Sequence, residues 1–429
     1  MMCCMLGLAL GVHAQESVFL QQYREKVKAY NQDIKSAGYA VSIRQEAEKS
    51  AKADFLPSLS GNANASYTGN PLELYRELPS IETPLYFQGR DTKYGASVTL
   101  LQPVYSGGAL KAGLEKSRKE KESALYEEKR VTNDVLYQAD QYYWNKVACE
   151  EMVEVAAGFK ESVAALVEVV RHRVEEEYTD RNDLLMAEVK LNDVEFRLEQ
   201  ARNEAEVARL SMNSFSGEAS DKVILTDSLV VPLTEVQVYE QTLETAMAHR
   251  PELRIAANQV AIQQSAARIA NSRYLPKLSV GVDGSYSSPG YDFNSDLDPN
   301  YMVYAKLSVP IFEWGKRKNT RRIGKLDVNR ALENQSKVAD GVRLEVETAY
   351  YTYTQAVRQV CLTESSLAKA ATSEQLAMDK YKEGTISIVE VLNAQMYHQE
   401  AELNHIRSKL RAQLAKSSLE RAAGRLGEY

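Results

Sequence analysis

The sequence lacks any apolar run of eighteen residues or more, and its mean hydropathy is −0.40. Because a transmembrane helix needs about 20 consecutive apolar residues, this pattern excludes helical membrane spans, and a membrane could be crossed only by β-strands. An excess of positive charge is also lacking. The 52 Lys and Arg against 59 Asp and Glu give a net charge of −7, which argues against nucleic acid as a partner.

Cysteine is scarce, and two of the four cysteines lie in the apolar N-terminal stretch Met1–Val12. We interpret residues 1–14 as a secretory signal peptide, because "VHA" before Gln15 fits a small-x-small cleavage site, although no positively charged region precedes it. Its removal leaves Cys149 and Cys361 inside long helical patterns, where we expect small buried residues rather than a disulfide.

Catalytic motifs are lacking too: the chain has no "GxSxG", no glycine-rich phosphate loop and no "HExxH". We therefore predict neither an enzyme nor a cofactor. His398 and His405 lie seven residues apart with Glu402 nearby. A metal site facing the lumen of an oligomer is one interpretation, and solvated or seam histidines are the favoured one.

Proline is absent from 104 to 231 and from 311 to the end, which permits uninterrupted helix in both stretches. At about 1.5 Å per residue, a helix over 110–178 would be on the order of 100 Å long, which no compact globular domain needs. The segment after the first reversal has small or apolar residues at alternating spacings of three and four, as in a coiled coil: Leu184, Ala187, Leu191, Val194, Leu198, Ala201, Ala205, Ala208 and Met212.

The chain is a duplicated unit. "FLPSLSGNANASY" corresponds to "YLPKLSVGVDGSY", so that Pro57 matches Pro276, and further along the chain Pro103 matches Pro310. We predict an α+β fold with two repeats, 15–217 and 240–429, joined by an inter-repeat segment, 218–239. Each repeat is expected to contain one helix (17–54; 237–273), a β-hairpin (59–103; 278–310) and a helical hairpin (109–216; 316–424).

Four segments of nine or ten residues alternate between apolar and polar with period two, the length of a tilted strand that crosses a bilayer. Tyrosines stand at the loop end of each strand and would form an interfacial aromatic girdle: Tyr67, Tyr94, Tyr286 and Tyr301. A soluble sandwich with alternating faces is the alternative. The membrane interpretation is favoured because there are only four strands, and a very long helical hairpin follows each pair.

Four strands cannot close a barrel, and an open edge is costly in lipid, so the chain is expected to oligomerise. A dimer would give eight strands and a trimer twelve; since an eight-stranded barrel is filled by its own side chains, transport favours the trimer. The strands stop at two related motifs, "QPVYSGG" and "VPIFEWG". Here we expect strand pairing to end and the barrel-to-tunnel junction to lie: Pro103, Gly108, Pro310 and Gly315.

The helical hairpins reverse at 175–185 and 381–395, the second at Gly384. Carboxylates at these tips are either part of a solvated loop or, in a closed oligomer, a ring that favours cations. Taken together, the repeat, "QPVYSGG", "VPIFEWG", "HRPEL" and the tip "GTISIVEVLNAQ" resemble the TolC-like outer-membrane efflux protein family over nearly the whole mature chain.

The resemblance implies a homotrimer in the outer membrane, in contact with its lipid and extending into the periplasm. Long coiled-coil hairpins would form an α-barrel tunnel, and four strands per protomer would complete a twelve-stranded β-barrel. The implied partners are a periplasmic adaptor (membrane fusion) protein and an inner-membrane transporter of the RND or ABC type. The function implied is that of a passive exit duct; a structural coiled-coil envelope protein without channel activity is the alternative.

The resemblance also implies roles for tip residues. It places adaptor contacts at Tyr178, Thr179, Gly384 and Thr385. It places the periplasmic aperture at Glu390 and Asn393, where the family pattern has acidic residues, and Asn393 departs from that pattern. Ile386 replaces a basic residue that helps to close the entrance, so the closing network is either weaker or uses Asp183 and Asp180 instead. Asp183 is therefore counted with Glu390 and Asn393 among the predicted aperture residues.

Overall fold

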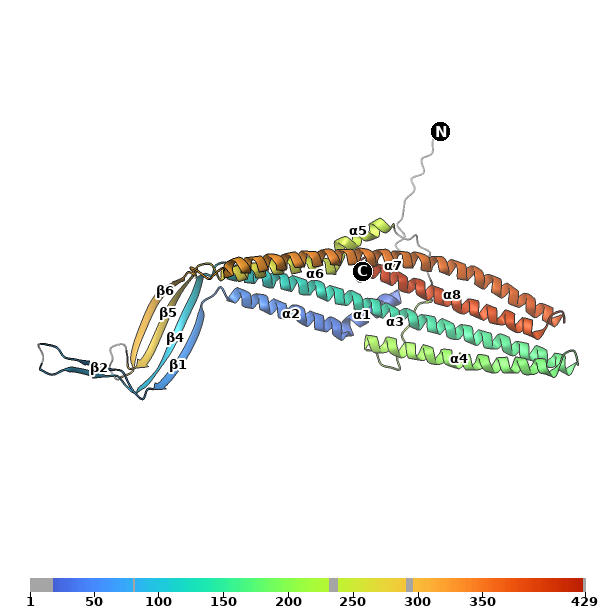
Figure 1. Cartoon of the computed structure of the whole chain (residues 1–429). Coiled ribbons are helices and arrows are strands. Elements are labelled where there is room, and N and C mark those ends of the chain that lie inside the picture. Colours follow the sequence, from blue (N-terminus) through green and yellow to red (C-terminus); the bar gives the residue numbers. More distant parts are fainter. Residues whose placement is uncertain (1–17, 80–81, 231–237, 291–295, 427–429) are drawn as a thin grey trace, which may run out of the picture. The chain divides into compact units, whose positions relative to one another are not determined.

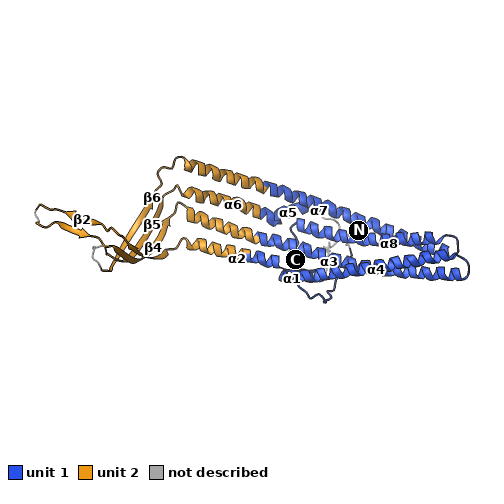
Figure 2. Cartoon of the chain, turned by 60° about the horizontal axis from the view of Figure 1, so that its bottom comes forward, with its two compact units in different colours: residues 1–39, 126–254, 336–429 blue, residues 40–125, 255–335 orange. Residues whose placement is uncertain are grey.

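The computed structural model describes residues 18–79, 82–230, 238–290 and 296–426. The predicted signal peptide, 1–14, lies outside these residues. The chain divides into two compact units to which both repeats contribute (Figure 2): unit 1 comprises 1–39, 126–254 and 336–429, and unit 2 comprises 40–125 and 255–335. Among the described residues, no helix combines the length and apolarity needed to span a bilayer.

Two long helices follow the strands, α3 (Ala109–Glu175) and α7 (Lys316–Lys382), each of 67 residues. Each ends in a tight reversal and pairs with a shorter helix, α4 (Arg181–Ser216) or α8 (Ile388–Ala422) (Figure 1). The repeat offset that relates Pro103 to Pro310 also relates both ends of α3 to those of α7. At about 1.5 Å per residue, each long helix spans about 100 Å, as its proline-free sequence predicts.

The expected single helix at the start of each repeat is wrong, because each is two helices. In the first repeat, α1 (Val18–Tyr30) and α2 (Gln32–Ala53) are separated at Asn31, whose side-chain oxygen accepts a hydrogen bond of 2.9 Å from the Asp33 amide and so caps α2. In the second, α5 (Tyr239–His249) stops at Arg250, and α6 (Pro251–Ser272) begins at a proline that disfavours helical backbone just before it.

The seam of α4 lies in the core of unit 1: Ala187, Val194, Leu198, Ala208 and Met212 are buried. The first hairpin packs with α1 around Tyr23, Tyr143 and Trp144. Beside this cluster, the Arg24 guanidinium makes two hydrogen bonds of 2.8 and 2.7 Å to the Asp140 carboxylate, which is fully buried. The expectation that both cysteines are buried is wrong: Cys149 is half-buried and Cys361 is exposed, because Cys361 lies next to the buried Val360 and off its face of α7.

Unit 2 contains one antiparallel sheet with the strand order β1-β4-β5-β6. Its members are β1 (Ser58–Tyr67), β4 (Thr92–Tyr105), β5 (Lys277–Ser288) and β6 (Asp298–Ser308). The strands β1 and β6 are its two edges. A second ribbon, β2 (Glu73–Arg76) with β3 (Leu85–Gln88), occupies the loop of the first hairpin, where we expected no strands.

The register places the predicted apolar positions that lie within the four strands on one face. Residues directly opposite each other project to the same side of a sheet, and the pairs Gly61–Val98, Leu100–Val282 and Val282–Val303 connect the four apolar sets. On β4 the apolar residues are the exposed ones, whereas Gly95, Ser97 and Thr99 are half-buried. This is the reverse of the pattern in a soluble sandwich, where the apolar face is covered.

The four predicted girdle tyrosines also share this apolar face. Their register positions step by two residues from strand to strand: Tyr67 faces Thr92, Tyr94 lies on β4, Tyr286 faces Ala96, and Tyr301 faces Gly284. All four side chains are exposed, by 42–80%. The line through the four tyrosines is therefore oblique to the direction perpendicular to the strands. The four rings lie at one level of the membrane, as expected from the sequence, only if the strands are tilted.

Candidate functional site at the hairpin tips

The tip of the first hairpin is a short reversal between α3 and α4. Glu177 adopts a left-handed backbone with φ 60°, and the Tyr178 amide donates to the Arg173 carbonyl at 2.8 Å. Asp180 is the N-cap of α4, and its carboxylate accepts from the Asn182 amide at 3.2 Å. The Thr179 hydroxyl donates to the Asp183 carboxylate. Tyr178 itself is 71% exposed, so the reversal presents a large aromatic ring to solvent.

The second tip repeats this geometry at the equivalent positions of the second repeat. Gly384, the counterpart of Glu177, has φ 78°, and the Thr385 amide donates to the Lys380 carbonyl at 3.0 Å. Ser387 is the N-cap of α8, and the Glu390 carboxylate accepts from the Ser387 amide at 3.3 Å, in a capping box. Glycine is suited to this left-handed position, whereas the glutamate of the first tip occupies it at a cost.

Arg173 joins the two tips. From α3, its guanidinium donates to the carbonyls of Tyr381 and Lys382 at 2.6 and 3.4 Å and lies 5.0 Å from the Tyr381 ring centroid. The tips also share an apolar cluster that includes Val170, Ala187 and Val391. Burial raises the pKa of the Tyr381 phenol above its ordinary value, and Arg173 opposes this shift. Neither Arg173 nor Tyr381 was predicted from the sequence to be a functional residue. The available signal for Tyr381 was its position, three residues before Gly384.

The predicted aperture residues lie next to the tips. Asp183 and Glu390 occupy equivalent positions in the first turns of α4 and α8, where a carboxylate is stabilised by the helix N-terminus. Glu390 is exposed, Asp183 is half-buried, and Asn393 is exposed. Each carboxylate accepts a local hydrogen bond, Asp183 from the Thr179 hydroxyl and Glu390 from the Ser387 amide. The placement of these residues at an aperture stays a proposal.

At the predicted junction, Gly108 and Gly315 have φ 84° and 82° and directly precede α3 and α7. Their carbonyls accept the first helical hydrogen bonds, from Ala112 and Asn319, at 3.0 and 3.2 Å. The expectation that Pro103 ends strand pairing is wrong on one side. Pairing of β4 with β1 ends at Leu101, but pairing with β5 continues through Pro103 to Tyr105, because a proline lacks only the N–H that would face one neighbour. Pro310 follows the end of β6.

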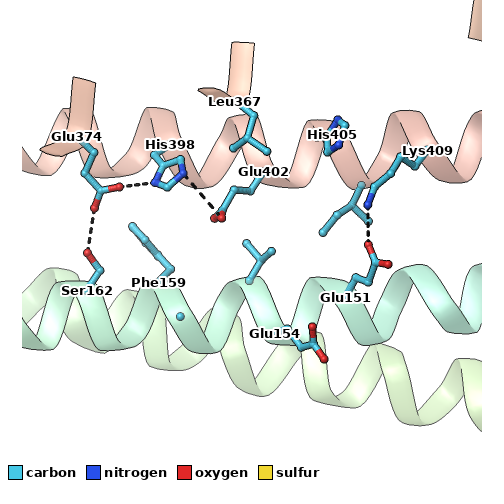
Figure 3. A pocket seen from close by; sticks show the side chains of 13 residues that line it. Glu151, Glu154, Phe159, Ser162, Leu367, Glu374, His398, Glu402, His405 and Lys409 are labelled. Atoms are coloured by element: carbon cyan, nitrogen blue, oxygen red, sulfur yellow. Dashed lines mark hydrogen bonds and ion pairs between the residues drawn. The ribbon is translucent and has the colours of Figure 1, made fainter. Parts of the chain in front are cut away.

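A cavity of about 610 Å³ lies between α3, α7 and α8 within unit 1 (Figure 3). In it, His398 lies between two carboxylates: Nδ1 bonds Glu374, and Nε2 is 3.8 Å from Glu402. His405 instead contacts the Thr363 hydroxyl at 3.2 Å. Among the described residues, no group of three or more His, Cys, Asp or Glu is arranged to hold a metal ion. The two histidines thus belong to separate polar contacts of the helical seam.

Replacing Glu402 by glutamine is expected to stabilise the fold at pH 8 by less than about 1 kcal/mol, which would be measured as a higher unfolding temperature. The gain is small because the Glu402 side chain is partly solvated. Burial raises the pKa of Glu402 above its ordinary 4.5, although His398 opposes the shift. The contribution of the protonated Glu402 carboxyl group to the stability of the folded state is thus fully present below pH 4.5. It is lost as the pH rises through the pKa that Glu402 has in the folded state. Thermal unfolding in detergent should show the gain shrinking towards pH 4.5. The exposed Glu400→Gln is the control; an equal gain there would contradict the assignment.

Comparison with known proteins identifies the class. The family model described as "Outer membrane efflux protein" matches residues 24–218 and 242–425. The curated outer membrane efflux protein BepC of Brucella suis is 23% identical over 380 residues, covering 86% of this chain and 77% of BepC. The pyoverdine export outer membrane protein OpmQ of Pseudomonas putida is 24% identical over 179 residues, 42% of this chain and 38% of OpmQ.

Among solved structures, the CmeC outer membrane channel of Campylobacter jejuni superposes with a TM-score of 0.78 at 16% identity, covering 95% of this chain and 86% of CmeC. This likeness confirms the fold: a duplicated repeat with long helical hairpins and strands. The chain belongs to the outer membrane efflux protein family. It is an outer-membrane efflux protein, and the predicted resemblance and outer-membrane localisation are confirmed.

Proposed function

We propose that the chain is the passive exit duct of a tripartite efflux or type I secretion system and works as a homotrimer. The observation that carries the proposal is the sheet of unit 2. Its apolar face is exposed, its two edges are β1 and β6, and the chain continues from β4 and β6 into helices of 67 residues. An exposed apolar face fits lipid, and edges in lipid must be paired.

Three copies satisfy these requirements. Pairing β1 of one protomer with β6 of the next would give twelve strands and remove every edge. An eight-stranded barrel from two copies would be filled by side chains and would not conduct. The polar face, which includes Asn62, Ser97 and Asp283, would then line the water-filled interior.

The tips are the proposed docking site for a periplasmic adaptor that connects the duct to an RND-type or ABC-type transporter. The exposed Tyr178 ring and the hydroxyls of Thr179 and Thr385 offer one apolar and two polar contacts. Since Arg173 holds the two tips of a protomer together, an adaptor that contacts one tip would also act on the other. The aperture would lie at Asp183, Glu390 and Asn393.

Replacing Glu390 by glutamine tests the channel. Glutamine at this position still accepts the capping hydrogen bond, so the tip is retained and only the charge is removed. A unit charge about 4 Å from an ion in water is worth about 1 kcal/mol, and it attracts potassium while it repels chloride. We therefore expect the potassium-to-chloride permeability ratio of the reconstituted channel to fall by at least about fivefold. Reversal potentials in planar bilayers measure this ratio.

Glu383→Gln is the matched control, because Glu383 is exposed on the same tip but outside the proposed aperture. An unchanged ratio in Glu390→Gln would place Glu390 away from the constriction. The alternative function, a structural coiled-coil envelope protein without channel activity, predicts no conductance even for the wild type.

A further inference from the structure

Residues 311–325, which run from the end of β6 into the third turn of α7, are first apolar and then basic. Ile311, Phe312 and Trp314 are 95, 69 and 87% exposed, and the rings of Phe312 and Trp314 lie 4.9 Å apart. Six exposed cations follow within ten residues: Lys316, Arg317, Lys318, Arg321, Arg322 and Lys325. Glu313 is the single acidic residue of 309–325, so this stretch carries six positive charges against one negative charge.

The six cations differ from those at the equivalent helix start of the first repeat. Among the residues that the structure describes, none of the six side chains forms an ion pair with an acidic residue, whereas two of the three cations at the equivalent positions of the first repeat, 109–118, are paired. There, Lys116 and Arg118 each lie 3.5 Å from a carboxylate, that of Glu120 and that of Glu48 respectively. The basic surface is therefore specific to the second repeat.

Trp314 occupies a backbone position that suits glycine. Its φ is 45°, and its counterpart in the first repeat is Gly107, with φ 65°. A side chain at Gly107 would meet the Ser272 carbonyl oxygen at 2.8 Å, so the first repeat has neither the room nor the conformation for one. The second repeat accepts a left-handed tryptophan, which is strained, and exposes its ring. Strain retained at an exposed aromatic residue indicates a binding surface.

We propose that residues 311–325 bind the headgroups of anionic phospholipids in the periplasmic leaflet of the outer membrane, an inference that rests on the proposed insertion of the four strands. The segment begins where the apolar face of β6 ends, so it would lie at the headgroup level. Tryptophan is enriched at that level, and clustered Lys and Arg attract anionic lipid. Arginine pairs with phosphate through two parallel hydrogen bonds, which favours a phosphate-bearing headgroup.

Tryptophan fluorescence tests the proposal directly, because the chain has two tryptophans. Trp144 is 6% exposed in the helical core, so Trp144→Phe leaves Trp314 as the reporter. The full-length protein is reconstituted into vesicles of phosphatidylethanolamine and phosphatidylglycerol in equal amounts. Two samples are compared, in which either the phosphatidylethanolamine or the phosphatidylglycerol carries brominated acyl chains. Bromine quenches the fluorescence of an indole ring that it contacts. We expect quenching by brominated phosphatidylglycerol to be at least about twofold stronger. The preference should fall at about 0.5 M salt, where the Debye length is about 4–5 Å.

Charge variants assign the preference to this surface. The triple variant Arg317→Gln/Lys318→Gln/Arg321→Gln should lose it, whereas Lys337→Gln/Arg358→Gln/Lys369→Gln, three exposed cations elsewhere on α7, should keep it. Equal quenching by both lipids in protein that floats with the vesicles would overturn the lipid proposal alone. A preference unchanged in the first triple variant would overturn it too. Protein that does not float and is quenched by neither lipid would overturn strand insertion itself.

Discussion

Replacing Val98 by arginine is expected to abolish assembly in the outer membrane. Val98 lies near the middle of β4 on the apolar face, is 52% exposed, and has glycines directly opposite on both sides, Gly61 and Gly284. Because glycines lie opposite, an arginine side chain at this position has room, and overpacking could not explain a loss of assembly. If the face contacts lipid, the charge costs about 2–4 kcal/mol per protomer at the bilayer midplane, and a trimer carries three such charges.

Ser97→Arg is the matched control. Ser97 is the neighbouring residue on β4 but projects to the polar face, between Asn62 and Ser285. It should assemble at close to the wild-type level and alter conductance instead. Membrane fractionation followed by gel electrophoresis of unheated samples measures the assembled oligomer. Normal assembly of Val98→Arg, or equal loss in both variants, would show that the apolar face does not contact lipid.

Replacing Arg24 by methionine is expected to destabilise unit 1 by about 3–5 kcal/mol. The Arg24 side chain is 6% exposed, and its partner Asp140 is fully buried, with both carboxylate oxygens bonded to the guanidinium. Removing the arginine leaves an uncompensated buried charge, which is the costly way to break such a pair. The double variant Arg24→Met/Asp140→Leu removes both charges and should recover most of the loss.

The exposed pair of Arg44 and Glu120 provides the comparison. Its atoms lie 3.4 Å apart with side chains 50 and 25% exposed, so Arg44→Met should cost less than about 1 kcal/mol. Unfolding in detergent, monitored by loss of helical circular dichroism, gives the free energies. Equal small losses in Arg24→Met and Arg44→Met would mean that the Asp140 site is solvated.

The long helices and the strands followed directly from local pattern. A proline-free stretch and a constant repeat offset relate α3 to α7, and period-two alternation marks the apolar face that the register then joins across four strands. These features repeat along the chain, so periodicity reveals them. The helix break at Asn31 depended on one side-chain cap, a weaker signal that the helical pattern on both sides concealed.

The contacts that organise the tips and the core could not be predicted in the same way. Arg173 meets Tyr381 across 208 residues, and Arg24 meets Asp140 across 116. Each is a single charged residue within a helix rich in charged residues, so nothing in the local pattern distinguishes it from its solvated neighbours. The ribbon of β2 and β3 was missed because its strands are four residues long, too short for a period to be recognised.

The oligomeric state of the purified protein tests the central proposal most directly. Protein extracted from the outer membrane with detergent should have the mass of three chains by native mass spectrometry, and it should dissociate to the monomer on heating, because the β1–β6 pairing between protomers closes the sheet. A monomer that is released from the periplasm without detergent would contradict the account.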